Sequence, residues 1–101
     1  DAYYQVRKAD NVVDLICTFQ LVEGVIIDTA IVRGTTYLNF ADDWRSDFTI
    51  TLKKRALATF IEAGLDPLLL KGKSVRVRGW LKKRNGPMIE ATHPEQLELM
   101  Q

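Results

Sequence analysis

Alternating apolar and polar residues along the chain predict short strands interrupted once by a helix. Residues 15–33 are rich in β-branched side chains, which favour strands. These nineteen residues are too many for one flat strand, so we expect a bulge or sharp bend at Gly24 that lets the segment serve two sides of a curled sheet. A turn at Arg33-Gly34 leads into a second strand over 35–40, and a third follows over 46–52.

The second predicted strand has one apolar and one polar face. Thr36, Leu38 and Phe40 share the face that we expect to point inward, because side chains alternate along a strand. Tyr37 and Asn39 share the opposite, outward face. In the third strand the same period places Phe48, Ile50 and Leu52 inward and Asp47, Thr49 and Thr51 outward.

After residue 52 the apolar period changes from two to that of a helix. A helical stripe contains Ala56, Leu57, Phe60 and Ile61. Gly64 stands where a helix stop belongs. A strand over 73–83, a turn at 84–87 containing Asn-Gly, and a strand over 88–92 follow, and residues 96–100 add a short strand or a helical turn.

The predicted order is therefore three strands, one helix and two strands. This order matches an all-β barrel with one helix, the five-stranded and partly open OB-fold. An SH3-like barrel is the main alternative, but it normally lacks a central helix. We expect an N-terminal arm over 1–13 and a single OB-fold domain over 14–101.

Composition removes most enzyme chemistry. The 101 residues include one cysteine and one histidine, which exclude an internal disulfide, a multi-cysteine metal site and a paired-histidine motif. We expect Cys17 to be a buried small apolar residue and His93 to be a structural hydrogen-bonding partner. No apolar run has the length of a membrane-spanning helix, and we expect no cofactor and no metal.

The net charge of +1 hides a strong asymmetry. Residues 1–50 carry four basic and eight acidic side chains, whereas residues 51–101 carry ten basic and five acidic ones. Half of all basic residues fall between positions 71 and 84, a window without an acid. Such a cluster is typical of a surface that binds a polyanion, although a solvated strand face has the same composition.

Two segments, RVRGW at 76–80 and NGPMIEATHPEQ at 85–96, best carry a family resemblance that runs from about residue 20 to the C-terminus. The chain resembles the bacterial OB-fold domains related to staphylococcal nuclease, in the branch that binds nucleic acid without cutting it. Nuclease members hold Ca²⁺ with carboxylates, one of them in a Gly-Asp-Thr turn. Here that place reads Gly34-Thr35-Thr36, and a neutral hydroxyl is a poor substitute for a carboxylate on a hard dication. The missing initiator methionine leaves room for an exported or lipid-anchored bacterial parent. We therefore slightly favour an exported or envelope-anchored protein, a lipoprotein among the options, over a cytoplasmic one.

Candidate binding residues lie on the outward face of the predicted barrel. Tyr37 and Asn39 occupy the strand whose outer face is the usual oligonucleotide platform of this fold, and Tyr37 is placed either to stack a base or to pack at the barrel rim. Trp44, in the loop 41–45, is either a stacking surface or a lid over the barrel end.

The basic window supplies the remaining candidates. Arg76 and Arg78 alternate with Trp80, unless a bulge at Gly79 turns Trp80 into the core or acids on neighbouring strands, Asp47 or Glu90, pair with the arginines. The hairpin that follows is one of the two oligonucleotide-binding loops of the fold, and it contains Lys82, Lys83, Arg84 and Asn85.

The sequence thus predicts a non-catalytic OB-fold module that binds nucleic acid, with single strands favoured, through the basic hairpin and a face containing Tyr37, Arg76 and Arg78. Two alternatives stay open. One is a degenerate Ca²⁺-dependent phosphodiesterase that uses Asp28 and the acids at 42, 43 and 47. The other is a protein-interaction or envelope-associated OB domain, which the low net charge favours.

Overall fold

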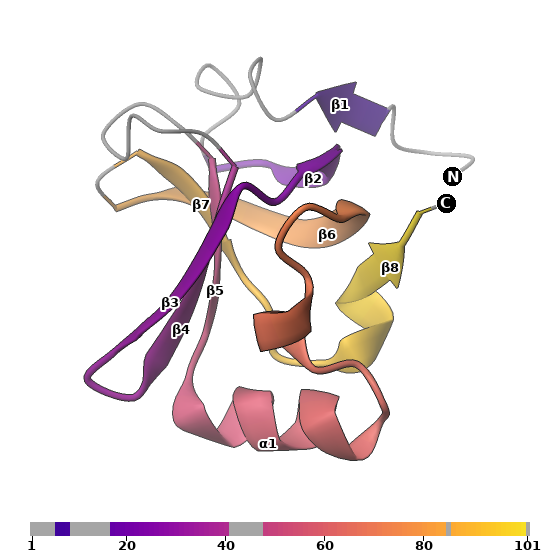
Figure 1. The fold of residues 1–101 in the computed structure, drawn as a ribbon. Coiled ribbons are helices and arrows are strands. Elements are labelled where there is room, and N and C mark those ends of the chain that lie inside the picture. The colour runs from indigo at the N-terminus through magenta and orange to yellow at the C-terminus, as the bar shows by residue number, and fades with distance from the viewer. Residues whose placement is uncertain (1–5, 9–16, 41–47, 85, 101) are drawn as a thin grey trace.

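The computed structural model describes residues 6–8, 17–40, 48–84 and 86–100. These residues form eight strands, one α-helix and two short 3-10 helices (Figure 1). In chain order they are β1 (Val6–Lys8), β2 (Phe19–Val25), β3 (Asp28–Val32), β4 (Thr35–Asn39), β5 (Thr49–Leu52), α1 (Lys54–Glu62), η3 (Pro67–Leu69), β6 (Ser74–Lys83), β7 (Pro87–Glu90), η4 (Pro94–Gln96) and β8 (Leu97–Leu99).

The strands form one curled sheet in the order β1-β2-β6-β7-β5-β4-β3, and β8 pairs with β6 as well. All neighbours are antiparallel except β1 with β2 and β5 with β7. Strands β2 and β3 lie far apart in this order, yet only Ile26 and Ile27 separate them in the chain. They act as the two halves of one bent strand, which confirms the predicted all-β barrel with one helix and the OB-fold order.

The bend lies two residues beyond the position predicted at Gly24. Strand β2 continues through Gly24, which pairs with Val75. The backbone changes partner at the next two residues, since the Ile26 N–H donates to the Lys73 carbonyl at 3.0 Å and the Ile27 N–H donates to the Asn39 carbonyl at 2.8 Å. The fully buried Ile26 side chain lies at this change of partner. Isoleucine favours strands in general, so its presence in the sequence did not indicate a bend here.

The N-terminal and C-terminal segments both contribute strands. Within the stretch predicted as an arm, β1 pairs in parallel with β2. At the other end, the segment 96–100, predicted as a strand or a helical turn, contains strand β8. The short helix η4 comes just before it and overlaps the segment at Gln96.

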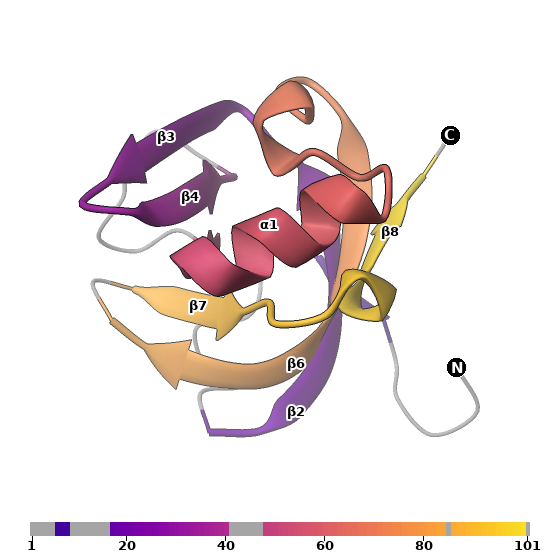
Figure 2. The ribbon, with the colours of Figure 1, turned by 90° about the horizontal axis from the view of Figure 1, so that it is seen from below.

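Helix α1 lies across one end of the barrel (Figures 1 and 2). Ala56 and Phe60 are its buried residues, whereas Ile61, from the predicted stripe, is about half exposed. The helix ends as predicted at Gly64, whose φ is 81°, and the Leu65 N–H donates to the Phe60 carbonyl at 2.9 Å. This is the usual way for a glycine to satisfy the last carbonyls of a helix.

Among the described helices, none is long and apolar enough to cross a membrane.

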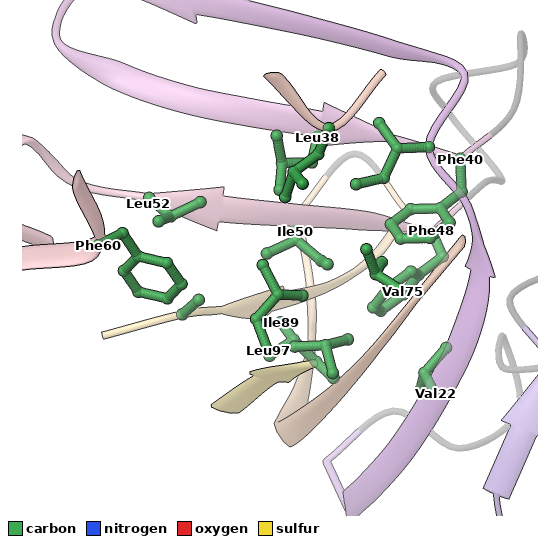
Figure 3. Close-up of a cluster of buried hydrophobic side chains, with 14 of the residues drawn as sticks. Val22, Leu38, Phe40, Phe48, Ile50, Leu52, Phe60, Val75, Ile89 and Leu97 are labelled. Atoms are coloured by element: carbon green, nitrogen blue, oxygen red, sulfur yellow. The ribbon is translucent and has the colours of Figure 1, made fainter. Parts of the chain in front are cut away.

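The core fills the inside of the barrel and the space beneath α1 (Figure 3). Phe60 of α1 lies near Leu52 of β5 at one end of this cluster, and the rings of Phe40 and Phe48 are 5.1 Å apart at the other. The apolar residues predicted to point inward from the second and third strands are all part of it: Leu38, Phe40, Phe48, Ile50 and Leu52. Thr36, also predicted inward, is fully buried.

Strand β6 alternates along its whole length, so the bulge considered at Gly79 does not form. Val75, Val77 and Leu81 are fully buried. Gly79 also faces inward, against Ile89 of β7 and the Gln96 side chain. The Gln96 amide fills the gap between β7 and β8 on this edge of β6, because its Nε2 donates to the Arg78 carbonyl at 3.0 Å and its Oε1 accepts from the Thr92 N–H at 2.8 Å.

Replacing Gly79 by alanine tests this contact. A Cβ at residue 79 would lie 2.7 Å from Ile89 Cγ2 and 3.2 Å from Gln96 Nε2, so we expect G79A to lower the free energy of unfolding by about 1–3 kcal/mol, the usual cost of overpacking. The measurement is urea unfolding. The sign of the change in unfolding free energy is decisive, since alanine in an open site would instead stabilise the protein by about 0.4–1 kcal/mol.

Candidate nucleic-acid interface

The outward side chains of β4, β5, β7 and the end of β6 form two cross-strand rows. In the first row Tyr37 lies opposite Thr51, and Thr51 lies opposite Glu90. In the second row, strand pairing joins four residues in the order Asn39, Thr49, Met88 and Lys82. We call these two rows the outer face. Side chains opposite one another in a sheet are close enough to contact a common ligand.

A pocket of about 310 Å³ lies on the outer face beside the β6–β7 hairpin. Tyr37, half-buried, lines it from β4, and Lys82, Lys83 and Arg84 line it from the hairpin. Four of the predicted binding residues, distant in sequence, therefore meet at one pocket. Tyr37 lies on the outer face and not in the core, so its ring is available at the pocket wall.

Asn39 and Asn85 were also predicted to bind, and the structure describes the position of Asn39. Asn39 lies in the second row, where its Oδ1 accepts a hydrogen bond from the Thr49 hydroxyl at 3.3 Å. Asn85 lies outside the described residues. On either side of it in the chain, the Arg84 N–H donates a hydrogen bond to the Gly86 carbonyl at 2.8 Å. Asn39 is thus adjacent to the pocket without lining it.

Some lining residues were not among the predicted binding residues: Thr35, Thr51, Lys53, Met88 and Glu90. Alternation had already placed Thr51 outward, but it is only 6% exposed because the neighbouring side chains of the outer face cover it. What brings Thr51 and Glu90 to the same pocket is the parallel register of β5 with β7, and no local sequence pattern reveals that register. Alternation identifies an outward residue, and only the pairing tells which pocket it lines.

The pocket is predominantly cationic. Lys53, Lys82, Lys83 and Arg84 surround one acid, Glu90. The Lys53 Nζ is 3.7 Å from the Glu90 Oε2, and the Lys53 side chain is 73% exposed whereas that of Glu90 is 22% exposed. An ion pair with one partner so exposed contributes little stability. The three basic hairpin residues have no ion-pair partner among the described residues.

A second hollow of about 490 Å³ begins on the other side of this ion pair. Lys53 and Glu90 line it too, together with Arg55 of α1 and His93. As predicted, His93 takes part in a local hydrogen-bonding turn: its backbone N–H donates to the Gln96 Oε1 at 3.1 Å, and its Nδ1 lies 2.9 Å from the Thr92 hydroxyl.

Arg76, Arg78 and Trp80 lie on the part of β6 that pairs with β2, and they do not line the pocket. Trp80 is 59% exposed and packs edge-on against Phe19, with ring centroids 5.9 Å apart, so it points outward and not into the core. Arg76 contacts Glu23 of β2, with 3.4 Å between Nη2 and Oε2, and not Glu90. The predicted single face of Tyr37, Arg76 and Arg78 therefore divides into two surfaces.

Other sequence expectations have mixed outcomes. Cys17 is exposed and has a φ of 72° in a turn, so its predicted burial is wrong. The Asp28 carboxylate accepts from the Thr29 N–H at 2.9 Å and lies 3.9 Å from the Lys71 Nζ. Trp44 and the acids at 42, 43 and 47 lie outside the described residues. Within the described part of the chain no three His, Cys, Asp or Glu side chains gather as a metal site would require.

Comparison with known proteins agrees with the fold. No family model matches the chain, and no curated protein does. Solved structures do match: asparaginyl-tRNA synthetase from Pyrococcus horikoshii (22% identity, TM-score 0.62, 93% of this chain and 22% of that one) and the Stn1-ten1 complex of S. pombe (16%, TM-score 0.58, 82% and 58%). An OBody bound to hen egg-white lysozyme is also similar (14%, TM-score 0.57, 87% and 84%).

These similarities show the OB-fold. The chain spans about a fifth of the length of the synthetase that it matches, 22% by coverage, so the likeness concerns one domain of a larger enzyme.

The Arg76–Glu23 pair gives a prediction that separates structural from binding cations. The two side chains are 28% and 22% exposed, so we expect R76A to lower the free energy of unfolding by about 1 kcal/mol, between the values for exposed and buried pairs. Arg78, two residues along the same strand face and exposed, is the matched control. Urea unfolding in which R78A loses as much stability as R76A would contradict this assignment.

Proposed function

We propose that this OB-fold is a non-catalytic module that binds nucleic acid, with single strands preferred, at the pocket between Tyr37 and the β6–β7 hairpin. The observation that carries the proposal is the meeting of one outward aromatic ring with three exposed basic side chains around one pocket. In single-strand binding, a cationic groove follows the phosphates and aromatic rings stack on the bases.

The position of the pocket supports the same function. It lies on the outer face of β4 and β5 and against the β6–β7 hairpin. These elements are the second and third strands, and the loop between the fourth and fifth strands, of a five-stranded OB-fold. In OB-folds this is the general location of oligonucleotide contacts. A base that stacks on Tyr37 must be free of a paired strand, which favours a single-stranded ligand.

Trp80 and Arg78 offer a second contact for the same strand. Both side chains are exposed on the outward side of β6, and Lys82 follows Trp80 on that side. A strand that leaves the pocket past Lys82 would next meet Trp80. Asn39 flanks the pocket in this proposal, and Asn85 stays a predicted contact from the sequence. Arg76 has a mainly structural role because it is paired with Glu23.

A binding role also fits the chemistry at the position that a nuclease relative would use for metal. The resemblance to staphylococcal nuclease places a metal carboxylate where this chain has Thr35, and Thr35 lines the pocket. The Thr35 hydroxyl is a poor Ca²⁺ ligand. In this proposal the phosphates of a bound strand are therefore met by the lysines and the arginine of the pocket and not by a metal ion. We therefore favour binding over hydrolysis, and kinship with that family is a proposal from the sequence alone.

Removing the hairpin charges tests the proposal. In the triple variant K82A/K83A/R84A we expect affinity for a fluorescent single-stranded oligonucleotide to fall. We also expect the negative slope of log K against log salt to become less steep by about 2, since each phosphate contact contributes about 0.7 to its magnitude. Fluorescence anisotropy at several salt concentrations measures both quantities, with EDTA present throughout.

The matched control is K54A/K71A/K73A, which removes the same charge from exposed positions away from the pocket. Equal losses in the two triple variants would mean that binding follows net charge and not the hairpin. No binding by the unmodified chain, even at low salt, would reject the proposed function and turn attention to a protein partner.

The Tyr37 ring gives an independent prediction. If a base stacks on it, Y37A should weaken oligonucleotide binding by about 1–3 kcal/mol, the usual contribution of one stacked base. The conservative variant Y37F keeps the ring and should bind nearly as well. A loss in Y37F equal to that in Y37A would indicate that the hydroxyl, and not stacking, is what matters; anisotropy with the same probe distinguishes the two.

A further inference from the structure

One carboxylate stands inside the cationic pocket, away from the hairpin tip. Glu90 is the acid among its lining residues, and its side chain is mostly buried, with 22% exposed. In the first row of the outer face it lies next to Thr51, and Thr51 lies next to Tyr37. The acid is therefore placed beside the proposed stacking position and not along the path of the phosphates.

Glu90 has unused capacity to accept hydrogen bonds. Its contact within the described residues is the 3.7 Å ion pair with Lys53, whose side chain is 73% exposed. An ionised carboxylate has two oxygens and about four acceptor sites, and it has no donor. A mostly buried carboxylate with one long ion pair is suited to accept hydrogen bonds from a ligand.

An acceptor-only group discriminates among the bases by their donors. Guanine presents two neighbouring donors on its Watson–Crick edge, N1–H and the 2-amino group, which match the two oxygens of one carboxylate. Adenine and cytosine each present one amino group beside a ring nitrogen acceptor. Thymine and uracil present one N–H between two carbonyl oxygens, which a carboxylate repels.

We propose that Glu90 makes this pocket prefer guanine, an inference that rests on the proposed function. Single-stranded bases are read in this way, through their Watson–Crick edges while they stack on aromatic side chains. The pocket volume, about 310 Å³, lies at the small end of ligand sites and suits a single nucleotide. An acid in a phosphate-binding pocket lowers overall affinity, so its benefit is specificity.

The test compares heptadeoxynucleotides of the form TXTXTXT, in which X is guanine, hypoxanthine, adenine, cytosine or thymine. Anisotropy is measured in a lithium buffer, which disfavours guanine quadruplexes. We expect the guanine probe to bind roughly tenfold more tightly than the thymine probe, as for one good bidentate contact to a base. Hypoxanthine keeps N1–H and lacks the 2-amino group, so its probe should bind with intermediate affinity.

The variant Glu90→Gln removes one acceptor and introduces a donor at the same size. We expect it to reduce the guanine preference to within about twofold, with affinity for the thymine probe kept or increased. Glu62→Gln, at the exposed end of α1, makes the same charge change away from the pocket and should keep the preference. Thermal melting checks that both variants remain folded.

Each outcome has a distinct meaning. Equal binding of all five probes by the unmodified chain would overturn the guanine preference and leave the proposed function standing. A preference that survives Glu90→Gln would overturn the role of Glu90. Absence of binding to every probe would overturn the inference and the proposed function together.

Discussion

The parallel pairing of β5 with β7 is the constraint on which the site depends. Helix α1 and strand β6 separate these two strands in the chain, so their contact joins the β3–β4–β5 sheet to the β6–β7 hairpin. Its register is fixed from inside, because Ile50 and Ile89 lie opposite each other and both are fully buried. If either strand slipped by one residue, its own isoleucine would turn outward. The same register places Thr51 beside Glu90 on the outer face, so the core determines the arrangement of the pocket.

The bent strand completes this arrangement on the other side of the barrel. Ile26 still bonds to the β6 side, and Ile27 already bonds to β4. One continuous segment thereby pairs with β6 through β2 and with β4 through β3, and α1 closes one end (Figure 2). Much of this architecture was predictable from sequence, because alternation identified the inward residues of β4, β5 and β6 and the helical period identified α1. The position of the bend was not predictable, since it depends on where the partner strands end.

The binding site, like the fold, was predictable only where a local sequence pattern decides the outcome. Alternation placed Tyr37 outward, and the cluster of basic residues singled out Lys82, Lys83 and Arg84 in the hairpin. Arg76 and Arg78 do not line the pocket beside Tyr37, because charge along the sequence does not show which strand lies alongside. Strand β6 pairs with β2 over most of its length and with β7 only near its end, so the continuous basic window is divided between an ion pair and a pocket.

The alternation in β4 has a consequence for how such a chain diverges. Thr36 and Leu38 are fully buried, while Tyr37 and Asn39, between and beside them, contribute nothing to the core cluster. Selection for folding therefore acts on every second strand residue, and those positions accept many apolar side chains of suitable volume. The outer positions are free to change with the ligand. The structures that resemble this chain share its fold at 14–22% identity, so very different sequences can satisfy the same inward pattern.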